Sequence, residues 1–134
     1  MKKVYDNTCD ERRESAVAME ICKQWKCDST RFGDNDKTTY QLSRGNNIVA
    51  LCETRCLEIA SSDYPTFMIP YKNIKQLRSI AQNQLVPAFI VVHYKEDIQY
   101  FNVEETPDWL EEGSRDTTEV AHYKTKRLKS IYPV

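Results

Sequence analysis

Hydrophobic and polar positions alternate along the chain with two different periods, which predict both helices and strands. Apolar residues recur at helical spacing over residues 10–25 and again over residues 71–85, so each segment is expected to form an amphipathic helix. A second group of segments has the apolar and β-branched composition of strands, and it comprises residues 38–43, 48–57, 88–94, 98–103 and 118–123. The order helix, two strands, helix, three strands predicts an α/β (α+β) fold, in which a mixed β-sheet is flanked by helices.

Short polar segments join these strands into two hairpins. Residues 44–47, Arg-Gly-Asn-Asn, lie between the first two strands and readily adopt the positive φ that a tight turn needs. Residues 95–97, Lys-Glu-Asp, lie between the next two strands. The run 88–94 is continuously apolar, which is typical of a strand that is covered on both faces.

Composition limits the kinds of protein this can be. A chain of 134 residues with 40% hydrophobic and 29% charged residues is expected to fold around one core, so residues 1–134 are interpreted as a single domain. The formal net charge is −1, so any contact with a nucleic acid depends on a local basic patch. The sequence contains no secretory signal and no apolar stretch long enough to span a membrane, which predicts a cytoplasmic protein without a membrane partner.

Five cysteines are present, and we expect all of them to be reduced and unligated. Their number is odd, and a chain of this length can form a stable core without disulfide bonds. Two pairs have a spacing that invites a zinc interpretation. The second pair, Cys52 and Cys56, lies on a predicted strand, where the two residues would stand roughly 13 Å apart. That separation is too great for one metal ion, so no zinc is expected.

Two charged residues on the second predicted strand are candidates for chemistry. Side chains alternate between the faces of a strand, so Glu53 and Arg55 share one face. One interpretation is an ion pair that satisfies both charges at the rim of the sheet. The other is a metal-binding carboxylate beside a cation that holds a phosphate or the attacking water.

Several segments occur in an order that resembles the PD-(D/E)XK, or restriction-endonuclease-like, nucleases. Residues 48–56, Ile-Val-Ala-Leu-Cys-Glu-Thr-Arg-Cys, are similar to the apolar strand that carries the family's Glu-x-Lys. Residues 62–67, Ser-Asp-Tyr-Pro-Thr-Phe, followed by Lys72 and Leu77, are similar to the next loop and helix. Residues 87–92 and 115–120 are similar to two later strands. The resemblance covers residues 14–131 and is closest to small phage-type members, which implies the restriction-endonuclease-like fold.

The resemblance also implies the positions of site residues. Glu53 and Asp36 would be catalytic residues that hold Mg²⁺ in an active enzyme, and Arg55 takes the place of the family's lysine. Glu14, on the first predicted helix, would be a third acidic residue of the site. Lys72 and Arg115 would bind nucleic acid.

Two departures from the family pattern bear on activity. The hairpin position at which the family has an aspartate is Thr39 in this chain, and Asp36 is the nearest acidic residue, outside the usual register. Arg55 keeps a positive charge, but its planar guanidinium stays protonated and does not orient water as an ammonium does.

These departures favour a nuclease-fold protein that has lost or weakened its metal-dependent catalysis and acts by binding DNA or a protein partner, and that could be a viral protein in a host cell. The alternative is an active Mg²⁺-dependent DNA endonuclease or a resolvase-like phosphodiesterase.

Overall fold

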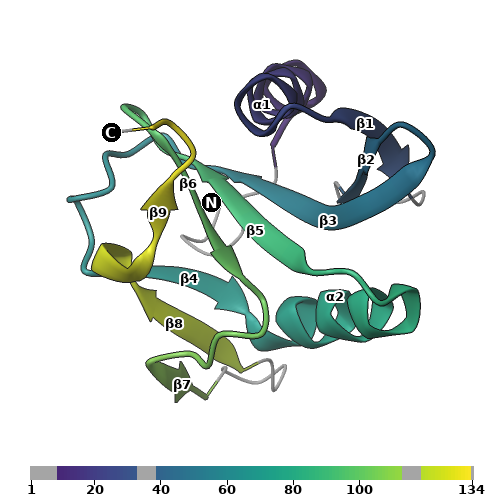
Figure 1. The fold of residues 1–134 in the computed structure, drawn as a ribbon. Helices are drawn as coiled ribbons and strands as arrows, with labels where there is room; N and C mark the ends of the chain where they lie inside the picture. Colours follow the sequence, from purple (N-terminus) through teal and green to yellow (C-terminus); the bar gives the residue numbers. More distant parts are fainter. Residues whose placement is uncertain (1–8, 33–38, 113–118, 134) are drawn as a thin grey trace.

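A computed structural model of the protein describes residues 9–32, 39–112 and 119–133 (Figure 1). The helical segments are α1 (Glu11–Trp25), α2 (Tyr71–Gln84) and the short 3-10 helix η1 (Thr125–Arg127). The strands are β1 (Asp28–Phe32), β2 (Thr39–Arg44), β3 (Asn47–Cys56), β4 (Thr66–Pro70), β5 (Ala88–His93), β6 (Ile98–Asn102), β7 (Trp109–Glu111), β8 (Val120–Lys124) and β9 (Lys129–Ser130). This mixed α+β arrangement is consistent with the restriction-endonuclease-like fold, so the predicted fold class is confirmed.

The strands form two sheets, and β3 is central to the larger one. That sheet has the order β1-β2-β3-β5-β6-β9, in which β3 runs antiparallel to β2 and parallel to β5. The hairpin between β2 and β3 turns at Gly45, whose φ of 61° lies in the left-handed region that glycine adopts easily. Between β3 and β5 the chain crosses over through β4 and α2, as the parallel pairing requires.

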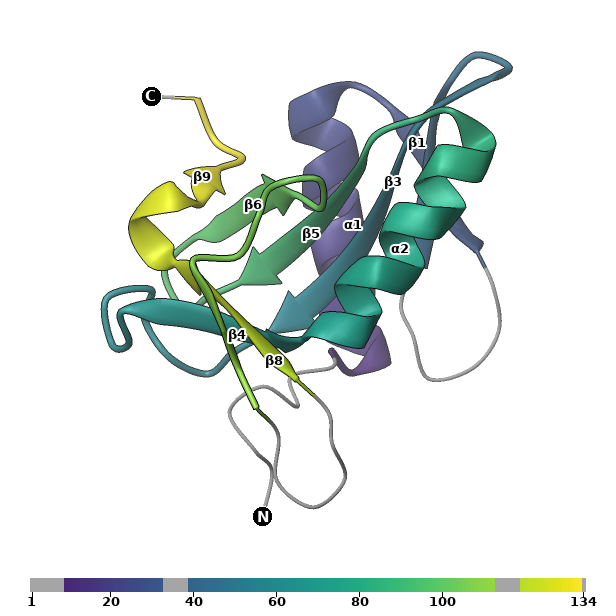
Figure 2. The same ribbon diagram turned by 90° about the horizontal axis from the view of Figure 1, so that it is seen from below.

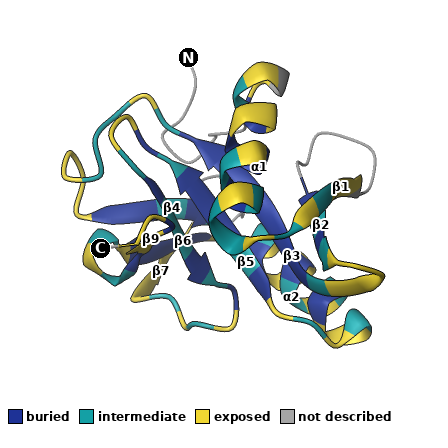
Figure 3. Cartoon of the chain, turned by 45° about the horizontal axis from the view of Figure 1, so that its top comes forward, coloured by how far each residue is buried: buried dark blue, intermediate teal, exposed yellow. Residues whose placement is uncertain are grey.

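Helix α1 covers one face of the large sheet, as Figure 1 shows. The helix begins after Asp10, whose carboxylate accepts a hydrogen bond from the backbone N–H of Arg13 at 2.9 Å, and it ends at Lys26 in a left-handed conformation. Its apolar side packs Val17 and Ile21 against the sheet residues Cys52 and Val91, among others. The burial colours in Figure 3 show this division between the exposed outer side of α1 and the buried central strands.

Helix α2 and the smaller sheet lie on the opposite face of the large sheet (Figures 1 and 2). The apolar side of α2 contributes Ile74, Leu77 and Ala81 to a core that also contains Leu51 and Ile90. In the described part of the chain, neither helix has the length and apolar composition needed to cross a membrane.

The smaller sheet, with the order β4-β8-β7, differs from the single mixed sheet that the sequence predicts. The predicted last strand is observed as β8, but it pairs with β4 instead of extending the large sheet. Strand β7 has only exposed residues and no alternating pattern to reveal it. Its place depends on tertiary contacts with His122 of β8, which stacks on Trp109 and lies 2.8 Å from Glu111.

The cysteines provide a correction, because Cys9 and Cys56 form a disulfide. Cys9 lies just before α1 and Cys56 is the last residue of β3, so packing of α1 across the sheet brings their Cα atoms to 4.9 Å. The prediction that all five cysteines are reduced is therefore wrong for this pair. Cys22, Cys27 and Cys52 carry free thiols, and burial together with the nearby Cys22 raises the pKa of Cys27 to about 11.

Candidate active site

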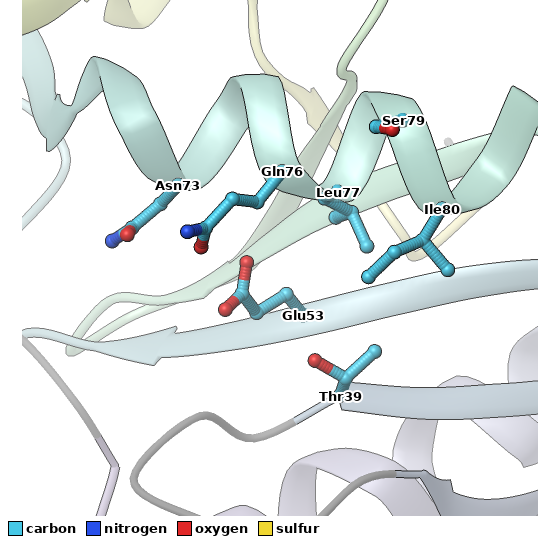
Figure 4. A pocket seen from close by; sticks show the side chains of 7 residues that line it. All are labelled: Thr39, Glu53, Asn73, Gln76, Leu77, Ser79 and Ile80. Atoms are coloured by element: carbon cyan, nitrogen blue, oxygen red, sulfur yellow. The ribbon is translucent and has the colours of Figure 1, made fainter.

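The candidate site is a pocket between the β2–β3 hairpin and α2 (Figure 4). Glu53 of β3 and Thr39 of β2 are directly paired across the two antiparallel strands, so their side chains lie on the same face of the sheet. The pocket has a volume of about 310 Å³. The described residues that line it are Thr39, Glu53, Asn73, Gln76, Leu77, Ser79 and Ile80.

Within this site Glu53 and Arg55 form a buried ion pair. Arg55 Nη2 lies 3.4 Å from Glu53 Oε1, and the side chains are 6% and 2% exposed, respectively. Arg55 Nη1 donates a hydrogen bond of 2.9 Å to the carbonyl oxygen of Thr54, which fixes the guanidinium next to the strand. The expectation that Glu53 and Arg55 are neighbours on one face is therefore confirmed.

The face that carries this pair is the one that α2 covers. Leu51, two residues before Glu53, packs against the apolar side of α2 in the same core. The carboxylate of Glu53 extends toward Asn73 and Gln76 of α2, as Figure 4 shows. The described part of the pocket thus combines one carboxylate with side-chain amides, hydroxyls and an apolar wall.

Glu14 belongs to α1 and therefore lies on the other side of the sheet. Its carboxylate accepts a 2.8 Å hydrogen bond from the hydroxyl of Tyr40 and lies 3.4 Å from Nε of Arg31. Burial, together with this hydrogen bond, raises the pKa of Tyr40, so its hydroxyl remains a donor at neutral pH. Because Tyr40 belongs to the core under α1 and the adjacent Thr39 faces α2, the structure does not bring Glu14 into the pocket of Glu53.

The remaining predicted site residues are distributed differently. Lys72 is exposed near the beginning of α2, next to the pocket residue Asn73. Asp36 and Arg115 lie outside the described residues.

Sequence reasoning missed Asn73 and Gln76 as pocket residues. Their signal is a spacing of three and then four along the helix, from Asn73 to Gln76 to Ile80, which places all three side chains on one side of α2.

The comparison with known families agrees with this architecture. A family model described as "Phage putative PDDEXK endonuclease" matches residues 1–120. The chain belongs to this family. No curated protein sequence matches the chain.

Membership of the PDDEXK family implies a divalent metal, so the donor set of the pocket has to be tested against that requirement. Mg²⁺ prefers hard oxygen ligands and is normally held through carboxylates. Glu53 is the one carboxylate among the described residues that line the pocket, and the guanidinium of Arg55 already opposes its charge. Across the described ranges, no group of three His, Cys, Asp or Glu side chains could hold a metal ion. These residues by themselves do not fit a Mg²⁺ site of the family type.

Proposed function

We propose that this PDDEXK family member binds nucleic acid, DNA above all, with the face formed by α2 and the Glu53 pocket, and that its metal-dependent cleavage is lost or strongly weakened. The observation that carries this proposal is the pairing of Thr39 with Glu53. A carboxylate at position 39 would stand beside that of Glu53 and share a cation with it. A threonine hydroxyl brings no charge, so the affinity for Mg²⁺ falls.

Arg55 strengthens the argument against efficient cleavage. Its guanidinium lies close to the carboxylate that would bind a metal, and a second cation there would be repelled. Arginine also stays protonated and is planar, so it cannot take over the water-orienting role of an ammonium.

The charge of α2 supports nucleic-acid binding. The helix contains Lys72, Lys75 and Arg78 and has no acidic residue. Arg78 donates hydrogen bonds to the carbonyl oxygen of Val103, the shorter at 2.7 Å, and therefore has a structural role. Lys72 and Lys75 are exposed, so their charges can attract phosphates, although Lys75 Nζ also lies 5.1 Å from the centre of the Tyr71 ring.

Binding is tested by fluorescence anisotropy with labelled single-stranded and duplex DNA over a range of salt concentrations. We expect binding that weakens steeply as salt increases, because phosphate contacts release counterions. The double variant Lys72→Gln, Lys75→Gln should bind more weakly and with a smaller salt slope. Its matched control, Lys23→Gln, Lys95→Gln, removes the same charge from exposed positions outside this face and should bind as the wild type does. The absence of any binding at low salt would refute the proposed function.

An active Mg²⁺-dependent endonuclease is the second candidate. It is favoured by Oε1 of Glu53, which accepts no hydrogen bond within the described structure, and by Asp36, which precedes Thr39 by three positions. Plasmid and single-stranded DNA are incubated with the protein and Mg²⁺ or Mn²⁺. Robust cleavage that is abolished by both Asp36→Ala and Glu53→Ala would establish this alternative and contradict the loss of catalysis.

A further inference from the structure

The carboxylate of Glu53 has hydrogen-bonding capacity that the described structure does not use. The residue is 2% exposed, and Oε1 is closed off from solvent without accepting a hydrogen bond. Arg55 compensates its charge from 3.4 Å but donates its hydrogen bond to the Thr54 carbonyl oxygen instead. Buried carboxylate oxygens are nearly always hydrogen-bonded, so this atom indicates a place for an incoming donor.

Charge restricts the kind of donor that fits. Glu53 and Arg55 together carry no net charge, and the other described side chains that line the pocket are neutral. A ligand cation would gain attraction to Glu53 but would be repelled by the guanidinium beside it. A neutral group with N–H donors gains hydrogen bonds to the carboxylate without this repulsion.

Size and lining narrow the ligand further. The volume of about 310 Å³ lies at the lower end of the usual range for small-molecule sites, so a single heterocycle is a suitable occupant. Leu77 and Ile80 provide an apolar wall against which a flat ring can lie, while Asn73 and Gln76 stand beside the carboxylate (Figure 4).

We propose that this pocket takes up an unstacked guanine from a single strand of nucleic acid. The N1–H and N2–H groups of the base donate to the Glu53 carboxylate, and its O6 accepts from the side-chain amide of Asn73. Single-stranded nucleic acids are commonly recognised through such edges of splayed-out bases. This inference rests on the proposed nucleic-acid binding and identifies what one part of the binding face recognises.

The donor and acceptor pattern excludes the other bases. Only guanine presents two adjacent donors on its pairing edge, where a carboxylate can accept both. Adenine and cytosine would place a ring-nitrogen acceptor against the carboxylate, and thymine would place carbonyl oxygens on both sides of its one N–H. Facing acceptors repel one another, so specificity comes from rejection as well as from attraction.

The test uses the wild-type protein and short oligothymidylates that differ at one central nucleotide. Anisotropy titrations compare guanosine, inosine and adenosine at that position; inosine lacks the N2 amino group. Loss of one hydrogen bond to a charged acceptor predicts that the guanosine strand binds roughly tenfold tighter than the inosine strand. The adenosine strand should bind at least as weakly as the inosine strand. Equal affinity for guanosine and inosine would overturn the inference and leave the proposed function standing.

Variants locate the effect in the pocket. Glu53→Gln should abolish the preference for guanosine while salt-dependent binding to the strand persists. Asn83→Ala, at an exposed position of α2 outside the pocket, should keep the preference. Thermal melts check that both variants fold, and the inosine comparison does not depend on either of them. A preference that survives Glu53→Gln would refute the assigned acceptor.

Two further outcomes are decisive. Guanosine monophosphate that binds as tightly as the guanosine strand would identify a free nucleotide as the ligand and overturn the single-strand source. Failure of every oligonucleotide to bind at low salt would refute the proposed function together with this inference.

Discussion

Removing the guanidinium of Arg55 in the variant Arg55→Met is expected to destabilise the protein by about 3–5 kcal/mol, the usual cost of breaking a buried ion pair. Arg55 Nη2 and Glu53 Oε1 are 3.4 Å apart, and both side chains are almost completely buried. At that separation the attraction is about 5 kcal/mol for an effective dielectric constant of about 20. Methionine retains much of the aliphatic volume, so the loss should come mainly from the uncompensated charge of Glu53.

Urea unfolding at neutral pH measures this change. The midpoint should fall with little change in the slope, because the surface exposed on unfolding stays similar. Arg12→Met serves as the control, since Arg12 is exposed and its removal should change the stability by less than about 0.5 kcal/mol. Adding Glu53→Gln to Arg55→Met should recover part of the loss, because the remaining polar group is then uncharged.

The reasoning is refuted if Arg55→Met costs less than about 1 kcal/mol. It is equally refuted if Glu53→Gln adds its full cost in the Arg55→Met background, since two coupled residues cannot act independently.

Three other changes test different parts of the molecule. The double variant Thr39→Asp, Arg55→Lys should gain detectable Mg²⁺-dependent nicking of plasmid DNA, and adding Glu53→Ala should abolish it; no gain would contradict the role assigned to position 39. Reduction of the Cys9–Cys56 disulfide should lower the free energy of unfolding by about 4 kcal/mol, given its sequence separation of 47, whereas identical melting of the oxidised and reduced forms would count against it. Burial, and after it the nearby Arg13, lowers the pKa of His93 below 6.5 in the folded protein. The stability that neutral His93 contributes is therefore present above pH 6.5 and is lost as the pH falls through the lower folded-state pKa. Thermal melts should show that the variant His93→Asn loses less stability in acid than the wild type does.

The hydrophobic pattern alone determined the main elements. Helical periodicity located α1 and α2, and apolar runs located β2, β3, β5, β6 and β8, because these segments bury one or both faces in a core. The period of two along β3 also determined that Glu53 and Arg55 share a face, since that alternation is local geometry. The family pattern pointed to Thr39 as the counterpart of Glu53, and the structure pairs the two residues.

Tertiary structure decided which partners these faces meet. Alternation shows that Glu53 lies on the face of Leu51, but only packing shows that α2, with Asn73 and Gln76, covers it while Glu14 lies with α1. The smaller sheet was equally beyond the sequence, because the pattern predicted β8 as a strand but did not reveal β4 or β7, with which β8 pairs.

The disulfide between Cys9 and Cys56 was also decided by the tertiary structure. Cys9 and Cys56 meet only after α1 has docked on β3, and contacts between residues so distant in the chain depend on the global fold rather than on any local preference.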